Sequence, residues 1–225
     1  MIAYVPARAG SKRIPHKNAR NFMGKPLFVR AAEAAVQSGL FDKVIVSTDS
    51  PGILLTSWQY GFYYEYRDPS LCVDDVQLNQ VMRAKAFACD EDICLVYCNP
   101  FIRVEDLVEG YRKFVERDYV HVTAMTPVLY PDLDLVYPSW EDAGQFSFGK
   151  NWAWRVGDME YGASTGRVVV PSSRNIDINT PSDWDAAERL FARMSSSDNH
   201  FPVPYIKDWT WDGARHIASS AESLD

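Results

Sequence analysis

The sequence predicts a single α/β domain built on a mainly parallel, Rossmann-like sheet. Short apolar runs alternate with longer amphipathic patterns, which is the order expected of repeated β-α units. The 225 residues are 47% hydrophobic, which is enough to bury one full core near the upper size of a single domain. Helices cover both faces of such a sheet, so we expect ligands beyond the carboxyl ends of its strands.

The expected strands are the apolar runs, and the expected helices are the amphipathic segments. The runs are IAYVP, KVIVST, ICLVYC, YVHVTAM and GRVVVP, at residues 2–6, 43–48, 93–98, 119–125 and 166–171. Helical periodicity covers residues 26–39, 50–60, 104–118 and 180–194. The last helix is predicted to begin with Thr180 as its N-cap and Pro181 as its first residue.

One long segment, residues 127–164, shows no periodicity and is rich in Pro, Asp, Trp, Tyr and Gly. An irregular connection of this length is uncommon in a compact domain unless it has a function. We therefore expect an excursion with a role of its own. The domain is predicted to span residues 1–195, including this excursion, and residues 196–225 form a C-terminal tail.

Charge is distributed unevenly along the chain. Residues 1–32 contain seven Lys or Arg and no Asp or Glu, although the formal net charge is −7, so the remaining residues carry −14. An acidic body disfavours nucleic acid and anionic membranes as partners, because both reward widely spread positive charge. A local basic segment suits a small anionic ligand instead.

The sequence also indicates a compartment. It contains no run of eighteen apolar residues, and no signal-peptide pattern follows Met1. The four cysteines lack zinc-binding spacing and are expected to be free thiols. We therefore expect a cytoplasmic protein.

The basic loop VPARAGSKRIPHKN, residues 5–18, follows the first predicted strand. Backbone N–H groups near small residues such as Gly10 and Ser11 can bind phosphate oxygens, and basic side chains can neutralise their charge. The stretch matches neither the Walker pattern nor G-x-G-x-x-G. From spacing alone, a phosphate cradle and a solvated basic loop are equal alternatives.

Several stretches together resemble the acylneuraminate cytidylyltransferase family, the CMP-sialic acid synthetases. PARAGSKRIPHKN and the following GKPL resemble the PARGGSK, Pro-x-Lys-Asn and GKPL signature of this family. VIVSTDS, YEYRDPSLCVDD and PFIRVEDL resemble its next segments, and IDINTPSDW is similar to its Asp-Ile-Asp-Thr-Pro-Glu-Asp-Trp. DAGQFSFGK is similar to a stretch of the pseudaminic acid branch. The matches run in family order from Pro6 to Trp184.

This resemblance implies a fold and a reaction. The fold is the nucleotide-diphospho-sugar transferase type with a dimerisation excursion. The reaction transfers CMP from CTP to an acidic nine-carbon sugar, pseudaminic acid or a similar one, and releases pyrophosphate with Mg²⁺ as cofactor. The implied partners are CTP, an acidic sugar and a second copy of the chain in a homodimer.

The same resemblance implies the site residues. Arg8 and Lys17 are expected to be catalytic, because fixed cations stabilise the negative charge of a phosphoryl group in transfer. Arg13 is expected to be solvated or structural. The predicted nucleotide contacts are Arg8, Gly10, Ser11, Lys12, Lys17, Asn18, Arg67 and Asp74; the sugar contacts are Gln145 and Phe146; the magnesium ligands are Asp177 and Asn179.

Three departures from the family pattern keep alternatives open. Asn179 stands where the family has a second aspartate, Ala9 replaces the commoner Gly, and YCNP replaces Pro-Thr-Ala-Pro. An amide carbonyl can bind magnesium but brings no charge, so we expect a weaker site. A catalytically weak nucleotide-binding relative is one alternative, and an enzyme for a legionaminic, sialic or ulosonic acid is another.

Other side chains receive structural interpretations. Asp49 ends a predicted strand and is expected to cap the next helix. His16 is expected at the surface, and His121 is expected to be structural. Aromatic residues of the excursion are expected to form a subunit contact, because aromatics are enriched in interface cores; they are Trp140, Phe148, Trp152 and Trp154.

Overall fold

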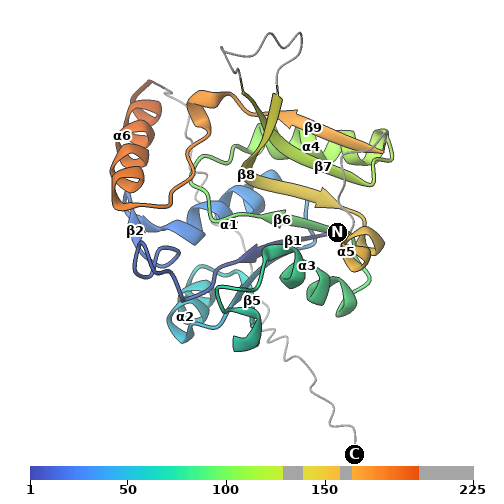
Figure 1. Cartoon of the computed structure of the whole chain (residues 1–225), viewed down its shortest axis with the longest axis horizontal. Helices are drawn as coiled ribbons and strands as arrows, with labels where there is room; N and C mark the ends of the chain where they lie inside the picture. Colours follow the sequence, from blue (N-terminus) through green and yellow to red (C-terminus); the bar gives the residue numbers. More distant parts are fainter. Residues whose placement is uncertain (129–138, 158–163, 198–225) are drawn as a thin grey trace, which may run out of the picture.

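The computed structural model describes residues 1–128, 139–157 and 164–197, which form a sheet with helices on both faces (Figure 1). Seven strands make the main sheet, in the order β5-β4-β1-β6-β8-β7-β9. A separate two-stranded hairpin follows the basic loop. The predicted mainly parallel α/β fold is confirmed.

The strands of the main sheet are β1 (Ile2–Pro6), β4 (Lys43–Thr48), β5 (Tyr63–Tyr66), β6 (Ile93–Val96), β7 (His121–Val128), β8 (Ser139–Gly149) and β9 (Thr165–Val169); the hairpin strands are β2 (Asn21–Phe22) and β3 (Lys25–Pro26). β1 pairs in parallel with β4 and β6, and β7 pairs in parallel with β9. β8 lies antiparallel between β6 and β7. Among the described strands of this sheet, β8 alone runs against the others.

The helices are α1 (Leu27–Ser38), α2 (Pro51–Gln59), α3 (Leu78–Phe87), α4 (Val104–Glu116), α5 (Asn151–Val156) and α6 (Pro181–Ser197), with 3-10 turns η1 (Pro69–Leu71) and η2 (Ser172–Arg174). Each predicted helix is present, whereas α3 and β5 were not predicted. Within the described ranges, no helix has the length and apolar character needed to cross a membrane.

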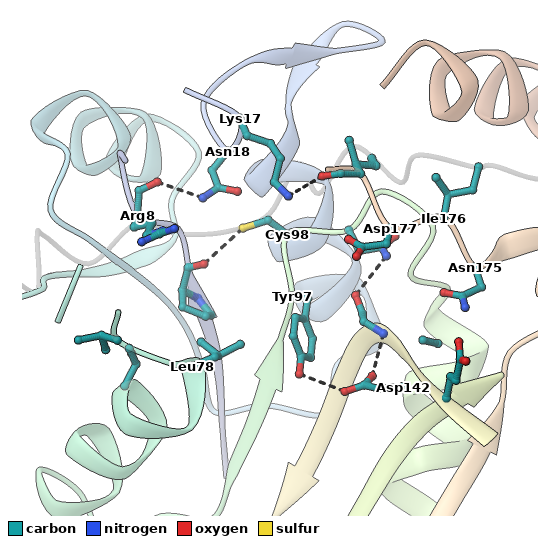
Figure 2. Close-up of a pocket in the computed structure, with 18 of the residues that line it drawn as sticks. Arg8, Lys17, Asn18, Leu78, Tyr97, Cys98, Asp142, Asn175, Ile176 and Asp177 are labelled. Atoms are coloured by element: carbon teal, nitrogen blue, oxygen red, sulfur yellow. Dashed lines mark hydrogen bonds between the residues drawn. The ribbon is translucent and has the colours of Figure 1, made fainter. Parts of the chain in front are cut away.

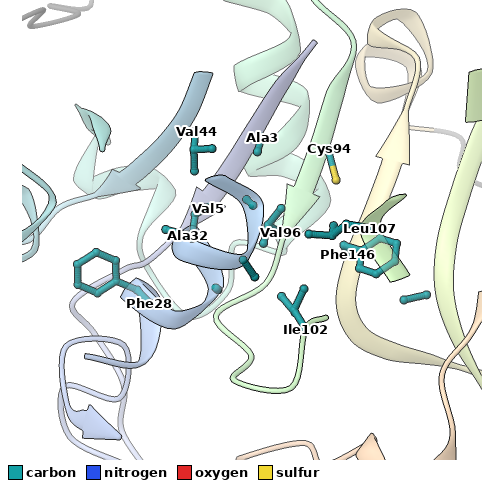
Figure 3. Packing of buried hydrophobic residues seen from close by; sticks show 14 of the residues in the cluster. Ala3, Val5, Phe28, Ala32, Val44, Cys94, Val96, Ile102, Leu107 and Phe146 are labelled. Carbon is teal, nitrogen blue, oxygen red and sulfur yellow. The ribbon is translucent and has the colours of Figure 1, made fainter. Parts of the chain in front are cut away.

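Two cores flank the sheet. Alternation along β1 sends Ala3 and Val5 to one face and Ile2 and Tyr4 to the other. The first face packs against α1, α2 and α4, in the cluster shown in Figure 3. The second face packs against α3 and α5. Full burial of a large side chain such as Phe28 contributes about 1.5–3 kcal/mol.

The predicted irregular excursion at residues 127–164 is wrong over its middle part. Residues 139–157 form β8 and α5 instead, and both belong to the core. Phe148 is completely buried and Trp154 is 4% exposed, so neither forms the expected subunit contact. Residues 129–138 and 158–163 of the predicted excursion, and 198–225 of the predicted tail, lie outside the described residues.

Helix α4 packs closely against β8, which makes β8 part of the core. A Cβ atom at Gly110 of α4 would lie 2.8 Å from the ring of Phe148 and 2.9 Å from that of Phe146. Only a residue without a side chain allows this approach. The β8 aromatic rings therefore lie directly beneath the helix.

The helix α6 anchors the region that follows the basic loop. Thr180 and Asp183 cap its start reciprocally: Asp183 N donates to Thr180 Oγ1 at 3.3 Å, and Thr180 N donates to Asp183 Oδ2 at 2.7 Å. This confirms the predicted N-cap. Trp184 is 1% exposed and packs edge-on against Phe22 of the β2–β3 hairpin, with ring centroids 5.3 Å apart. α6 is thus packed onto the hairpin that follows the basic loop.

His121 leads to a prediction about stability and pH. Its buried ring lies 3.0 Å from Thr123 Oγ1, and desolvation lowers its pKa from 6.5 to about 4. The unfolded chain therefore binds a proton that the folded chain excludes. We expect the free energy of unfolding to fall as pH drops from about 6.5 towards 4, by at most about 1.4 kcal/mol per pH unit from this group. Denaturant unfolding of His121→Gln should lack this part of the slope; equal slopes in both proteins would contradict it.

Candidate active site

A cavity of about 630 Å³ lies beyond the carboxyl ends of β1 and β6 (Figure 2). Five parts of the chain line it: the loop after β1, the segment from Arg67 after β5 through α3, the loop after β6, the first half of β8, and the segment before α6. Parallel sheets bind their ligands at this edge. The volume also lies within the range of small-molecule sites.

The predicted nucleotide contacts divide into two groups. Residues of the cavity wall are Arg8, Lys17, Asn18 and Arg67, whereas residues outside this wall are Gly10, Ser11, Lys12 and Asp74. The basic loop is therefore not a simple Gly/Ser cradle in this structure. Its longer side chains, rather than its small residues, reach the cavity.

Buried contacts hold the basic loop in place. Ile14 is 1% exposed and packs with Phe22 and Trp184 in a core cluster of its own. Asn18 Nδ2 donates to the carbonyl of Arg8 at 3.1 Å, which links the two ends of the loop. The loop geometry is thus set before any ligand binds.

Asp49 fixes the loop from the neighbouring strand. Its Oδ1 accepts from Ala9 N at 2.7 Å. The expectation that Asp49 caps α2 is wrong, because Ser50 is the N-cap and its Oγ accepts from Ile53 N at 3.3 Å. Asp49 instead satisfies the backbone N–H of Ala9 within the loop.

Asp74 gathers two cations at the edge of the cavity. Its carboxylate lies 3.0 Å from Arg8 Nη2 and 2.5 Å from Lys12 Nζ. The hydrogen bond from Lys12, with the nearby charges, lowers the pKa of Asp74. Arg8 also donates to the carbonyl of Cys72 at 3.2 Å. Asp74 therefore positions cations in this structure.

Lys17 places a desolvated ammonium group in the cavity wall. Its Nζ donates to the carbonyl of Ile178 at 2.7 Å, and burial lowers its pKa, although Asp177 opposes this shift. An ammonium group has three donors. Asp177 offsets the positive charge of Lys17 only in part, so a bound anion at this point would stabilise the ammonium group further.

Arg67 is the most buried cation of the site. The residue is 5% exposed, and its Nε donates to Cys72 Sγ at 3.0 Å. Its Nη2 is buried without a hydrogen-bond partner among the described residues. Leaving a buried donor unsatisfied costs about 1–3 kcal/mol, and more for a charged group. Because Arg67 lines the cavity, this donor is a candidate contact for a ligand atom.

The predicted metal pair Asp177 and Asn179 is only partly supported by the geometry. Asp177 lines the cavity, but Asn179 does not. The Asn179 amide donates through Nδ2 to Asp177 Oδ2, and its Oδ1 accepts from Arg13 Nη2 at 3.2 Å. The oxygen expected to bind magnesium is thus engaged by a cation. Asn179 therefore holds the Asp177 carboxylate through a hydrogen bond. Arg13 holds Asn179 in turn, which is one of the two roles expected of it.

Asp177 remains as the candidate metal ligand of the predicted pair. Within residues 1–128, 139–157 and 164–197, no cluster of three or more His, Cys, Asp or Glu side chains could hold a metal ion. Magnesium often takes only one or two protein carboxylates and completes its shell with phosphate oxygens and water. Asp177 fits that minimal role.

The geometry does not support the predicted sugar contacts Gln145 and Phe146. Both side chains are completely buried, and neither lines the cavity. Phe146 packs in the core, and Gln145 Nε2 donates to the carbonyl of Arg174 at 3.3 Å. Arg174 pairs in turn with Asp106 at 2.6 Å. Gln145 therefore supports the η2 turn from inside the protein.

The sequence analysis missed the neighbouring residue that does reach the cavity, Asp142. The register of β8 against β7 shifts here, because Ser147 faces Thr123 whereas Asp142 faces Met125. Gly144 adopts φ +58° within this bulge, and its N–H donates to Asp142 Oδ1 at 2.7 Å. An Asp followed two residues later by Gly is a turn signal that the sequence contained.

The loop after β6 supports this bulge. Tyr97 donates from its hydroxyl to Asp142 Oδ2 at 3.3 Å and from its backbone N–H to the carbonyl of Gln145 at 2.9 Å. Asn99 Nδ2 donates to the carbonyl of Gly144 at 3.1 Å. These bonds join two strands that the sequence separates by more than forty residues (Figure 2).

The cavity wall therefore carries charges of both signs. Arg8, Lys17 and Arg67 supply positive charge, which suits phosphates. Asp177 lies close enough to Lys17 to oppose the lowering of its pKa, whereas Asp142 belongs to the β8 part of the wall. These two carboxylates suit hydrogen-bond donors or a cation.

Comparison with solved structures supports the fold. The chain is similar to CMP:2-keto-3-deoxy-manno-octonic acid synthetase complexed with CTP, with a TM-score of 0.71 and 14% identity, over 86% of this chain and 98% of that one. It is also similar to a 4-diphosphocytidyl-2C-methyl-D-erythritol synthase from Anaerococcus prevotii, with a TM-score of 0.60 and 14% identity, over 85% and 98%. At this identity the likeness concerns the fold alone.

Sequence comparison gives the family. The chain is 28% identical to the pseudaminic acid cytidylyltransferase of Campylobacter jejuni and 27% identical to the CMP-N,N'-diacetyllegionaminic acid synthase of Legionella pneumophila. Each match covers 84% of this chain and 95% of the relative. The family model described as cytidylyltransferase matches residues 2–129, more than half of the chain. This chain is therefore a nucleotidyltransferase that belongs to the cytidylyltransferase family.

Proposed function

We propose that this protein transfers CMP from CTP to an acidic nine-carbon sugar, pseudaminic acid or a close analogue, and releases pyrophosphate. One observation carries the proposal: a single cavity combines desolvated cations with an unsatisfied buried guanidinium, in a cytidylyltransferase fold. Relatives that act on nine-carbon acidic sugars match almost their full length, which supports this choice of acceptor.

The proposed reaction uses the cations of the wall directly. A hydroxyl oxygen of the sugar loses its proton to water and forms a bond to the α-phosphorus of CTP, and the bond from that phosphorus to the bridging oxygen of pyrophosphate breaks. Negative charge rises on the phosphate oxygens during this step. Arg8 and Lys17 of the cavity wall are proposed to stabilise this charge as preorganised cations.

Arg67 and Asn18 are proposed to orient the nucleotide. The buried Nη2 of Arg67 provides a donor whose position is fixed by the Nε contact to Cys72. Asn18 is held by its bond to the Arg8 carbonyl, which keeps its side chain in the wall. Fixed donors select acceptors at matching positions, because a mismatch leaves buried groups unsatisfied.

Magnesium is part of the proposal. Asp177 would hold it together with phosphate oxygens, because the Asn179 oxygen is engaged by Arg13. When bound, the ion would offset triphosphate charge and make pyrophosphate a better leaving group. The engagement of Asn179 also favours the alternative of a catalytically weak nucleotide-binding relative. A legionaminic, sialic or ulosonic acid remains the alternative acceptor.

A cytoplasmic homodimer completes the proposal. The four cysteines, all within the described residues, are free thiols, which supports a reducing compartment. On α5, Trp152 is 57% exposed and Val156 is 62% exposed, which supplies apolar surface for a second copy. Light scattering at micromolar concentration should give twice the mass of one chain. A mass of one chain across that concentration range would contradict the dimer.

The first functional prediction concerns Lys17. We expect CTP to raise the melting temperature more than ATP does, and pyrophosphate release to require both CTP and the acidic sugar. Lys17→Ala should weaken CTP binding by on the order of tenfold or more, because it removes a desolvated charge partner. Titration calorimetry for CTP and a pyrophosphate assay measure the two effects.

Two controls accompany Lys17→Ala: a lysine substituted outside the cavity, and a variant of Lys17 that keeps the positive charge. Lys43→Ala, at the start of β4 and outside the cavity wall, should leave both values unchanged. Because the pKa of Lys17 is lowered in the unliganded protein, CTP affinity should fall as pH rises through that pKa, below the ordinary value of 10.5. Lys17→Arg should remove this fall. Equal binding of ATP and CTP would count against the assignment.

A second functional prediction concerns Asn179. The variant Asn179→Asp replaces the amide that donates to Asp177 by a second carboxylate. Without magnesium the two like charges should lower thermal stability, and magnesium with CTP should restore more stability than in the parent protein. The magnesium concentration for half-maximal rate should also fall. Thermal melting and metal titration test this, with Asp177→Ala as the variant that should lose turnover and retain CTP. Lower stability together with an unchanged magnesium dependence would refute the metal role of this region.

A further inference from the structure

Asp142 lines the cavity, but it takes no part in the reaction proposed above. It follows the start of β8, at the bulge where this strand leaves its regular register with β7. Its side chain is exposed to the cavity rather than to the core. In Figure 2 it lies across the cavity from Arg8 and Lys17.

The Asp142 carboxylate is held rather than mobile. Gly144 N donates to Oδ1 at 2.7 Å, and the Tyr97 hydroxyl donates to Oδ2 at 3.3 Å. Asn99 fixes the Gly144 carbonyl in turn. A carboxylate offers about four acceptor positions, and these two bonds occupy two of them. Each oxygen therefore retains acceptor capacity toward a ligand.

The negative charge of Asp142 limits which ligand groups can bind next to it. Phosphates and the carboxylate of an acidic sugar would be repelled by Asp142, and the nearby Glu141 and Asp177 carry the same sign. The cations Arg8 and Lys17 lie on the far side, where they suit those anions. Desolvation in the wall raises the pKa of Asp142, so a donor that replaces lost water would favour its ionised form. The group that fits is a neutral hydrogen-bond donor.

We propose that Asp142 is a specificity-determining residue that accepts a hydrogen bond from an acylamino N–H or a hydroxyl of the acceptor sugar. This inference rests on the proposed function. It assigns to the DAGQF stretch a role in acceptor choice through its first residue and its bulge, while Gln145 and Phe146 act inside the fold. A charge-assisted hydrogen bond of this kind discriminates strongly against acceptors that lack the donor.

The test separates acceptor binding from catalysis. In Asp142→Asn, one charged oxygen becomes an amide donor of the same size, so we expect KM for pseudaminic acid to rise about tenfold. The value of kcat should stay within about twofold, and CTP affinity should not change. Tyr97→Phe, which removes one bond to the carboxylate, should raise this KM less. Asp90→Asn, at a fully exposed carboxylate that pairs with Arg155 at 3.0 Å, is the matched control.

Two acceptors identify the donor. 2-Keto-3-deoxy-manno-octonic acid carries hydroxyls and no acylamino group, so a loss confined to pseudaminic acid identifies an N–H donor, and an equal loss identifies a hydroxyl. A drop in kcat with unchanged KM, together with loss of the acid limb of the pH profile, would overturn the proposal in favour of a general base. An unchanged KM and kcat would also overturn it.

Failure of the proposed function is separately visible. If the parent protein forms no CMP-sugar from either acceptor, the proposed function fails. Calorimetric titration of pseudaminic acid into the CTP-bound parent and Asp142→Asn proteins still tests Asp142. An affinity about tenfold lower in the variant supports the inference, and equal affinities, or no binding to the parent, overturn it.

Discussion

The antiparallel insertion of β8 between β6 and β7 is the constraint on which the site depends. Phe146 and Phe148 of this strand lie buried under α4, where Gly110 leaves room for their rings. This packing fixes the strand, and the bulge at Gly144 then turns Asp142 into the cavity. A strand that was only loosely attached could not hold a carboxylate opposite the basic loop. The packing of the core therefore determines the chemistry of the wall.

The opposite side of the cavity is organised by the same principle. Asp49 and Asp74 hold the loop after β1 through a backbone N–H and two cations, and Ile14 anchors it in a core with α6. Because these groups are ordered before binding, the entropic cost of binding a ligand is lower. Arg67 retains a buried donor without a partner among the described residues, which is a cost that ligand binding can relieve. The cavity therefore combines a loop that is ordered in advance with a buried donor, Arg67 Nη2, that lacks a partner among the described residues.

Much of this fold could be predicted from the sequence, because strands and helices with clear periodicity report their own burial. The first strand, α1, α4 and the capped start of α6 are examples. β8 could not be recognised, since its bulge interrupts the alternation and its aromatic residues also suit an interface. The roles of Gln145, Asp49 and Asn179 depend on partners distant in sequence, such as Arg174, Ala9 and Arg13. Residue type and motif position do not contain that information.

The most direct test of this account is a crystal structure of the protein with CTP and a non-reactive analogue of the acidic sugar. The account predicts the triphosphate against Arg8 and Lys17, a nucleotide atom within hydrogen-bond distance of Arg67 Nη2, and the sugar between the α-phosphate and Asp142. A nucleotide bound elsewhere, or a sugar that contacts Gln145 or Phe146 after rearrangement of β8 and leaves Asp142 in solvent, would contradict it.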